Sequence, residues 1–96
     1  MGYNVAAKVI SGEEAVEKIR EHEPDLVLMD IKLVGDLDGV EAMQQVRSFT
    51  DVPVLYLTGN SDERTRRRAY ATDPVAYMVK PVDIALLKKT IKEILD

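Results

Sequence analysis

Four short apolar runs alternate with four amphipathic segments along this chain, and that alternation is the feature that most restricts its fold. The predicted strands lie at 5–10, 25–30, 53–58 and 75–79. The predicted helices begin near Ser11, Asp38, Asp62 and Asp83. Alternation of this kind favours βαβ units, which place parallel strands in one sheet with helices on both of its faces. The sequence therefore predicts an α/β fold with four βα units.

Local patterns support several of these elements. Ser11 and Glu14, and again Asp38 and Glu41, have the spacing of a capping box at a helix start. The continuous apolar run at 26–29 is typical of a strand covered on both faces. The last predicted helix carries apolar residues at helical spacings: Ile84, Leu87, Ile91, Ile94 and Leu95.

Composition excludes several classes of protein. A chain of 96 residues, 46% of them hydrophobic, fits one small globular domain, which we place at 1–96. The formal charge of −4 argues against a domain-wide surface for nucleic acid. Without cysteine there is no disulfide, cysteine zinc site or cysteine nucleophile. No apolar run approaches the ~18 residues of a membrane span, and no signal peptide pattern is present, so we expect a cytoplasmic protein.

Three polar residues come at the ends of predicted strands, and ligands bind there in doubly wound sheets. Asp30 offers a carboxylate that can attack phosphorus, Thr58 a hydroxyl donor and Lys80 a fixed positive charge. A hard cation such as Mg²⁺ would bridge carboxylate and phosphoryl oxygens. Each residue alone has a commoner explanation, as a cap, a turn residue or a surface charge. Together they point to phosphoryl chemistry.

Four stretches of the sequence resemble the receiver domain of two-component response regulators: PDLVLMDIKL at 24–33, DGVEAMQQVR at 38–47, PVLYLTG at 53–59 and AYMVKPVD at 76–83. The resemblance runs from Tyr3 to Leu95. It implies a flavodoxin-like parallel sheet and a phospho-accepting signalling domain rather than an enzyme. It also implies a histidine kinase or phosphotransfer protein as phosphodonor, and an output domain or target that the sequence does not identify.

The resemblance also assigns roles to single residues. Asp30 is expected to accept the phosphoryl group, and Lys80 to contact one of its oxygens. Thr58 is expected to act as the switch hydroxyl, with Tyr77 as the aromatic that changes rotamer with it. The peptide between Lys80 and Pro81 is expected to be cis, which an X-Pro bond tolerates at small cost. The plainer explanation for Tyr77 is a core aromatic with a solvated hydroxyl.

Two further positions flank the expected site. Lys32, two residues after Asp30, is expected to give a backbone carbonyl to the metal, so that Asp30 and Lys32 are the expected metal ligands. Lys32 and Asn60 occupy the positions that tune the loss of the phosphoryl group in this family. For the Lys32 side chain itself we favour a solvated loop charge.

The sequence departs from the family at its start. Residues 1–5 resemble the entry into the family's second strand, so the first strand, the first helix and their acidic pair are missing. We therefore expect weak Mg²⁺ binding and slow or absent metal-dependent phosphorylation in this truncated domain. The missing strand lies between the strands at 5–10 and 25–30 in the family, so either a gap opens or the neighbours close up. An unpaired edge favours a homodimer or swapped assembly.

Alternatives remain open at this stage. The first is a phospho-accepting receiver, and the second is a receiver-derived interaction or dimerisation module without phosphoryl chemistry. An unrelated flavodoxin-type binding domain is disfavoured because no glycine-rich phosphate loop follows the first run. The arginines at 64 and 66–68 are either an interaction surface or a solvated helix face, and we favour the solvated face.

Overall fold

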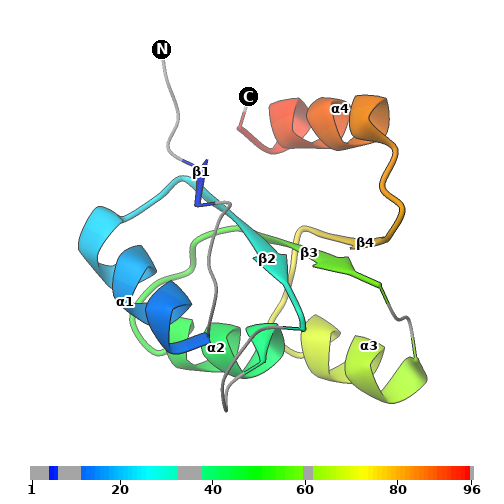
Figure 1. The fold of residues 1–96 in the computed structure, drawn as a ribbon. Coiled ribbons are helices and arrows are strands. Elements are labelled where there is room, and N and C mark those ends of the chain that lie inside the picture. Colours follow the sequence, from blue (N-terminus) through cyan, green and yellow to red (C-terminus); the bar gives the residue numbers. More distant parts are fainter. Residues whose placement is uncertain (1–4, 7–11, 33–37, 60–61, 96) are drawn as a thin grey trace.

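The computed structural model describes residues 5–6, 12–32, 38–59 and 62–95. Strands and helices alternate strictly along these residues, as predicted (Figure 1). The strands are β1 (Val5–Ala6), β2 (Leu26–Asp30), β3 (Val54–Thr58) and β4 (Ala76–Val79). The helices are α1 (Gly12–His22), α2 (Gly39–Val46), α3 (Glu63–Tyr70) and α4 (Ile84–Leu95).

The four strands form one parallel sheet in the order β1-β2-β3-β4, which confirms the predicted α/β class. β1 pairs directly with β2, through Val5 with Leu26 and Ala6 with Val27. Among the described residues these two strands are direct neighbours, so no gap separates them. Residues 7–10 of the predicted first strand lie outside the described part of the chain.

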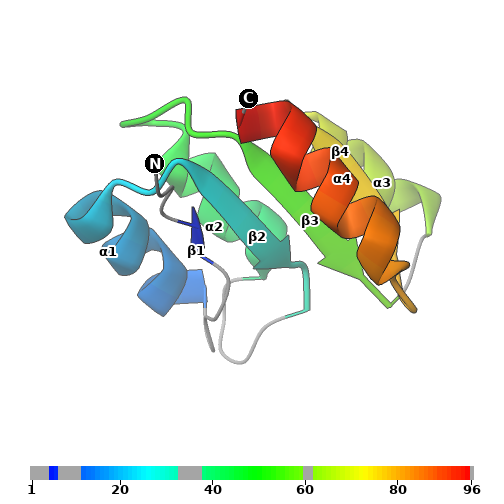
Figure 2. The ribbon, with the colours of Figure 1, turned by 90° about the horizontal axis from the view of Figure 1, so that it is seen from above.

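Helices cover both faces of the sheet, but unequally. Figures 1 and 2 show α1, α2 and α3 on one face and α4 by itself on the other, above β3 and β4. The prediction of helices on both faces is confirmed. None of the helices in the described ranges is long and apolar enough to cross a membrane.

The hydrophobic core lies between the sheet and the three helices on its first face. Alternate strand residues point into it, as the two-residue period of a strand requires: Val27, Met29, Val54 and Tyr56. The helices contribute Ile19, Val40, Met43, Val46 and Ala69. All of these side chains are buried, so this side of the sheet carries most of the packing.

The start of α2 is built as its sequence predicts. The Asp38 carboxylate accepts a hydrogen bond from the Glu41 backbone N–H at 2.8 Å. The Glu41 carboxylate accepts one from the Asp38 N–H at 3.2 Å. This reciprocal capping box satisfies two backbone donors that the helix itself leaves without partners. Ser11, of the other expected box, lies outside the described residues.

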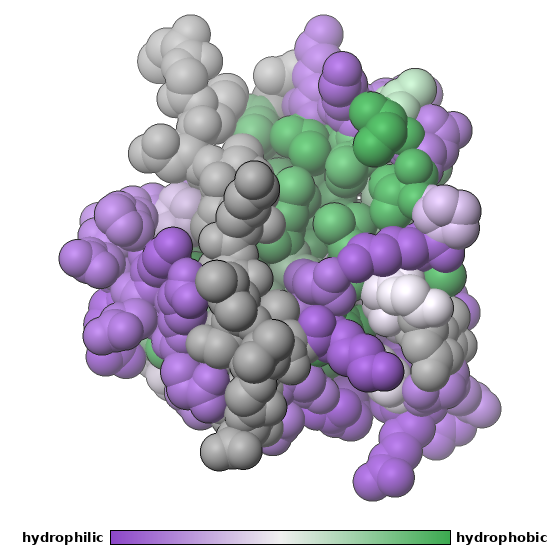
Figure 3. Space-filling view, in the orientation of Figure 1, coloured by the Kyte–Doolittle hydropathy of each residue, from purple (hydrophilic) through white to green (hydrophobic). Residues whose placement is uncertain are grey.

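The second face of the sheet is covered unevenly. Leu26 of β2 and Leu55 of β3 are fully buried on this face, so the expectation that β2 is covered on both faces holds at this part of the strand. Leu28, Leu57 and Met78 alternate with the core residues and stay half-buried. No residue of α4 is buried, and the Ile84 side chain is 60% exposed. Figure 3 shows hydrophobic side chains gathered on this face, over α4 and the neighbouring strands. Of the described helices, α4 is the one on this face, and Leu28, Leu57 and Met78 remain partly accessible to solvent.

Tyr56 anchors the end of α3 to the core. Its hydroxyl lies 2.6 Å from Thr72 Oγ1, and the Thr72 hydroxyl lies 2.6 Å from the carbonyl oxygen of Ala69. Because the threonine proton goes to that carbonyl, the tyrosine donates to the threonine. Burial raises the pKa of Tyr56 to about 12, while the hydrogen bond to Thr72 acts in the opposite direction.

We expect the stability of the protein to fall as the pH rises through the window from about 10 to about 12. The unfolded tyrosine ionises first, whereas the folded one holds its proton, so this contribution is fully present only below the lower value. Tyr56→Phe is expected to lower the free energy of unfolding by about 1 kcal/mol at neutral pH. It should also remove most of this alkaline loss. Urea unfolding of both proteins across this range measures the difference, and parallel pH profiles would contradict the assignment.

Candidate functional site

The three strand-end residues singled out in the sequence lie along one edge of the sheet. Asp30 is opposite Leu57 in the β2–β3 register, so it lies one position from Thr58. The Lys80 backbone N–H donates to the Thr58 carbonyl oxygen at 2.7 Å, which continues the β3–β4 pairing. The carboxyl ends of three neighbouring parallel strands therefore bring Asp30, Thr58 and Lys80 to a common edge, as expected for this fold class.

Asp30 and Lys80 form a direct ion pair across the edge. The Lys80 ammonium donates to one carboxylate oxygen of Asp30, and the backbone N–H of Lys32 lies 3.2 Å from the other. The two side chains are 37% and 45% exposed. Solvent-exposed ion pairs contribute little to stability. An accessible carboxylate held beside a fixed cation is instead suited to receiving an anionic group.

Thr58 and Tyr77 lie on the core side of the same region. The Thr58 side chain is buried, with 4% exposed. The Tyr77 ring packs edge-on against Tyr56 at 6.4 Å between ring centroids and stacks on Tyr70 at 5.7 Å. The Tyr77 hydroxyl is buried and has no hydrogen-bond partner among the described residues. Tyr77 is therefore a partly buried aromatic that packs against the core, but its hydroxyl is not solvated as the plainer explanation supposed.

Three further expected features concern the Lys80–Pro81 peptide, Lys32 and Asn60. The Lys80–Pro81 peptide is cis, as the resemblance implied. Lys32 is exposed, in keeping with a solvated loop charge. Asn60, the second expected tuning position, lies outside the described residues.

The described residues do not fit a protein-held Mg²⁺ site. Mg²⁺ prefers octahedral oxygen ligands and in proteins is commonly held by one or two carboxylates together with water and phosphate. Within the described ranges no three histidine, cysteine, aspartate or glutamate side chains come together. Asp30 supplies one carboxylate at this edge, and it already accepts hydrogen bonds from the Lys80 ammonium and the Lys32 backbone N–H.

Gly39 contacts the site through its backbone, a role that the sequence did not indicate. Its backbone N–H donates to the Ile31 carbonyl oxygen at 2.7 Å. A Cβ atom at this position would lie 2.3 Å from the Asp30 carbonyl oxygen and 2.9 Å from the Ile31 Cα. The first turn of α2 is thus packed directly against the backbone that carries Asp30. The Asp-Gly step at the helix start was the available signal, but it did not identify this contact.

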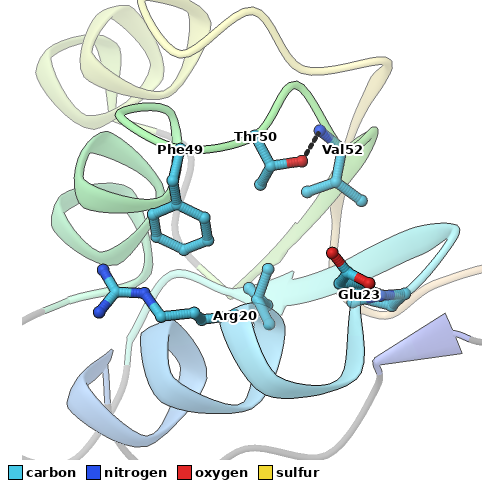
Figure 4. A pocket seen from close by; sticks show the side chains of 7 residues that line it. Arg20, Glu23, Phe49, Thr50 and Val52 are labelled. Carbon is cyan, nitrogen blue, oxygen red and sulfur yellow. Dashed lines mark hydrogen bonds between the residues drawn. The ribbon is translucent and has the colours of Figure 1, made fainter.

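A separate pocket of about 220 Å³ lies at the opposite edge of the sheet (Figure 4). Its lining comes from the end of α1 and from the segments that precede β2 and β3: Ile19, Arg20, Glu23, Pro24, Phe49, Thr50 and Val52. The Arg20 guanidinium lies 4.6 Å from the centre of the Phe49 ring. Because this pocket is at the amino ends of the strands, it is not part of the Asp30 site.

Comparison with known proteins finds similarity to response regulators over nearly the whole chain. Residues 1–92 match the family model of the response regulator receiver domain. The chain is 37% identical to the transcriptional regulatory protein ZraR of Klebsiella oxytoca over 95 residues, which are 98% of this chain and 21% of that protein. It is 37% identical over 84 residues to the transcriptional regulatory protein PdtaR of Mycobacterium tuberculosis, covering 88% of this chain and 40% of that protein.

Solved structures agree with the fold. A two-component response regulator of the LuxR family from Aurantimonas superposes with a TM-score of 0.83 at 31% identity, covering 99% of this chain and 68% of that one. The chain spans only about a fifth of the length of ZraR and two fifths of the length of PdtaR. The family model, the relatives and the strand-edge geometry lead to one conclusion: this chain belongs to the response regulator receiver domain family of two-component signalling.

Proposed function

We propose that this receiver domain is a signalling domain that accepts a phosphoryl group on Asp30 from a histidine kinase or phosphotransfer protein. The observation that carries the proposal is the accessible Asp30 carboxylate, held beside the Lys80 ammonium at the carboxyl edge of a parallel sheet. The carboxylate faces solvent, where a donor protein has access to it. The cation lies where negative charge arrives.

The proposed reaction is a displacement at phosphorus. An Asp30 carboxylate oxygen forms a bond to the phosphorus of a phosphohistidine while the bond from phosphorus to the imidazole nitrogen breaks. The imidazole leaves with the electron pair of that bond, and Asp30 becomes an acyl phosphate. Lys80 then pairs with a phosphoryl oxygen instead of the carboxylate. Stabilising the phosphoryl charge in this way is the main contribution a protein makes to such transfers.

The proposed switch uses Thr58 and Tyr77. The Thr58 hydroxyl turns toward the phosphoryl group, and the Tyr77 ring changes rotamer with it. A buried hydroxyl without a partner costs free energy, so the position of the Tyr77 hydroxyl in this structure favours a second rotamer in which it is hydrogen-bonded. Tyr70 of α3 stacks on the same ring, so α3 and β4 form the output face that this change would alter.

Receiver domains use Mg²⁺ for phosphorylation. Because the described residues do not by themselves make a Mg²⁺ site, we propose that this chain holds the ion only weakly. Asp30 and the backbone carbonyl of Lys32 are the expected ligands. They leave most of the coordination to water and to the phosphoryl group. Lys32 and Asn60 are proposed to tune the lifetime of the acyl phosphate. We expect phosphorylation to be slow, because a weakly held Mg²⁺ ion supplies little of the positive charge that stabilises the phosphoryl group during transfer.

Incubation with acetyl phosphate and Mg²⁺, followed by intact mass measurement, tests the proposal. We expect a slow gain of one phosphoryl group in the native protein and no gain in Asp30→Asn. Asp51→Asn is the matched control, because Asp51 is an exposed aspartate in the segment before β3, at the opposite edge. An equal gain in Asp30→Asn would show a different acceptor. No gain in the native protein would reject phosphoryl acceptance.

A second candidate function is a receiver-derived interaction module that forms a homodimer or swapped assembly without phosphoryl chemistry. The half-covered second face of the sheet favours it, because half-buried Leu28 and Leu57 and exposed Ile84 offer apolar area to a second copy. A cytoplasmic location, the domain limits of 1–96 and the identity of the output partner stay predictions.

Sedimentation velocity tests the assembly. We expect a dimer that Ile84→Glu weakens, because the new carboxylate is placed in the proposed apolar contact. An acidic residue in the first turn of α4 is favourable for the helix dipole, so the helix itself should be retained. Lys89→Glu places the same residue at another exposed position of α4 and should leave the dimer intact. A monomer at all concentrations would reject this assembly.

A further inference from the structure

The carboxylate of Asp38 makes contacts with two different helices. It caps α2 through the Glu41 backbone N–H, as described above. It also accepts hydrogen bonds from the Arg68 guanidinium of α3, at 3.0 Å and 3.2 Å from one nitrogen to its two oxygens. The two side chains are 35% and 29% exposed, for Arg68 and Asp38 respectively. One ion pair therefore connects the start of α2 with a helix that is 30 residues away in the sequence.

The start of α2 is in turn packed against the phospho-acceptor strand. The Gly39 N–H donates to the Ile31 carbonyl oxygen at 2.7 Å, and the missing Cβ of Gly39 leaves room for the Asp30 carbonyl. Because closely packed atoms transmit strain, the start of α2 cannot shift without a shift in the backbone that it touches. A displacement of Asp38 is thus expected to move the Asp30 backbone.

Two other arginines of α3 differ from Arg68 in their contacts. Arg67 pairs with Glu63 one helical turn away, at 2.8 Å, and both side chains are almost fully exposed. Arg66 lies over the rings of Tyr70 and Tyr77, at 5.7 Å and 5.9 Å from their centres. Arg68 instead forms an ion pair between two elements, so the interpretation of the whole cluster as a solvated face is wrong for this residue.

We propose that Arg68 is a positioning residue for the Asp30 site and acts through Asp38. By holding Asp38, it fixes the start of α2, where Gly39 is packed against the backbone of Asp30 and Ile31. Because Arg68 belongs to α3, the ion pair makes the geometry at Asp30 depend on the position of α3. The inference rests on the proposed phosphoryl acceptance by Asp30 and adds a connection to α3 separate from Thr58 and Tyr77.

A double-mutant cycle tests the positioning role. The variants are Arg68→Gln, Asp38→Asn and the two together, with Arg67→Gln as the matched control. Asn at position 38 keeps the ability to cap α2, so the helix start is retained. We expect each single variant to slow phosphoryl gain from acetyl phosphate about two- to fivefold, the range that a partly exposed ion pair supplies. The double variant should be no slower than either single variant, and Arg67→Gln should match the native protein.

A second readout separates this inference from the proposed function. In the unphosphorylated protein, we expect Arg68→Gln and Asp38→Asn to shift the NMR signals of the Ile31 and Lys32 amides, whereas Arg67→Gln leaves them in place. If the native protein gains no phosphoryl group, the proposed function fails, and these amide shifts still decide whether Arg68 positions the backbone of Asp30 and Ile31. Unchanged amides would overturn the inference. The inference would also be overturned if the rate losses of the two single variants multiplied in the double variant. It would be overturned as well if each rate fell only in proportion to the fraction of unfolded protein, which urea titrations measure.

Discussion

Replacement of Gly39 by alanine is expected to lower the free energy of unfolding by about 3 kcal/mol or more, at the upper end of what overpacking costs. The new methyl group would lie 2.3 Å from the Asp30 carbonyl oxygen and 2.9 Å from both the Ile31 Cα and the Met29 Cγ. Two of these three atoms belong to the backbone at the end of β2, which does not move aside cheaply. A loss of this size is a large part of the stability of a small domain.

Urea unfolding followed by far-ultraviolet circular dichroism measures this loss, since the chain has no tryptophan for fluorescence. Gly59→Ala is the matched control, because a Cβ at Gly59 would meet no atom of the described residues within 4 Å, its chain neighbours aside. We expect that control to stay within about 1 kcal/mol of the native protein, on either side. Equal stabilities for the two variants would show that α2 is not packed on the Asp30 backbone as described.

Lys80→Gln is expected to slow phosphoryl gain by about 10²- to 10³-fold, which is typical for the loss of one preorganised charge-stabilising group. The same change should alter the free energy of unfolding by less than about 1 kcal/mol, because the ion pair with Asp30 is partly exposed. Lys80→Gln is therefore expected to change the rate of phosphoryl gain with little change in stability, whereas Gly39→Ala is expected to lower the stability.

The rate with acetyl phosphate and the urea midpoint are measured on the same preparations. Lys18→Gln is the control, because Lys18 also forms a surface ion pair, with Glu14 at 3.1 Å. It should leave both quantities unchanged. A Lys80→Gln protein that gains the phosphoryl group at the native rate would remove Lys80 from the proposed chemistry.

Local patterns in the sequence predicted the elements and their arrangement well. The alternation of apolar runs with helical periodicity implies parallel strands, and parallel strands place their carboxyl ends at one edge. That is sufficient to bring Asp30 and Lys80 together, although they lie 50 residues apart. The capping box at Asp38 and Glu41 depends on neighbouring residues alone, and the structure contains it as predicted.

Contacts that depend on how a helix is seated on its neighbours could not be predicted from the same patterns. The approach of Gly39 to the Asp30 carbonyl depends on how α2 is seated on β2, and spacing along the chain does not record that distance. The pairing of Arg68 with Asp38 likewise depends on how two helices lie beside each other. The apolar stripe of α4 predicts an amphipathic helix but not how fully the sheet covers it, and Ile84 is largely exposed.

The most direct test of the central claim is to find which residue carries the phosphoryl group. After incubation with acetyl phosphate and Mg²⁺, borohydride reduces an acyl phosphate to the alcohol, so a phosphorylated aspartate becomes homoserine. Peptide sequencing by tandem mass spectrometry then identifies the position. We predict conversion of Asp30 and of no other aspartate. Conversion of a different carboxylate, or of none while the protein stays folded, would contradict the assignment of Asp30 as the phosphoryl acceptor.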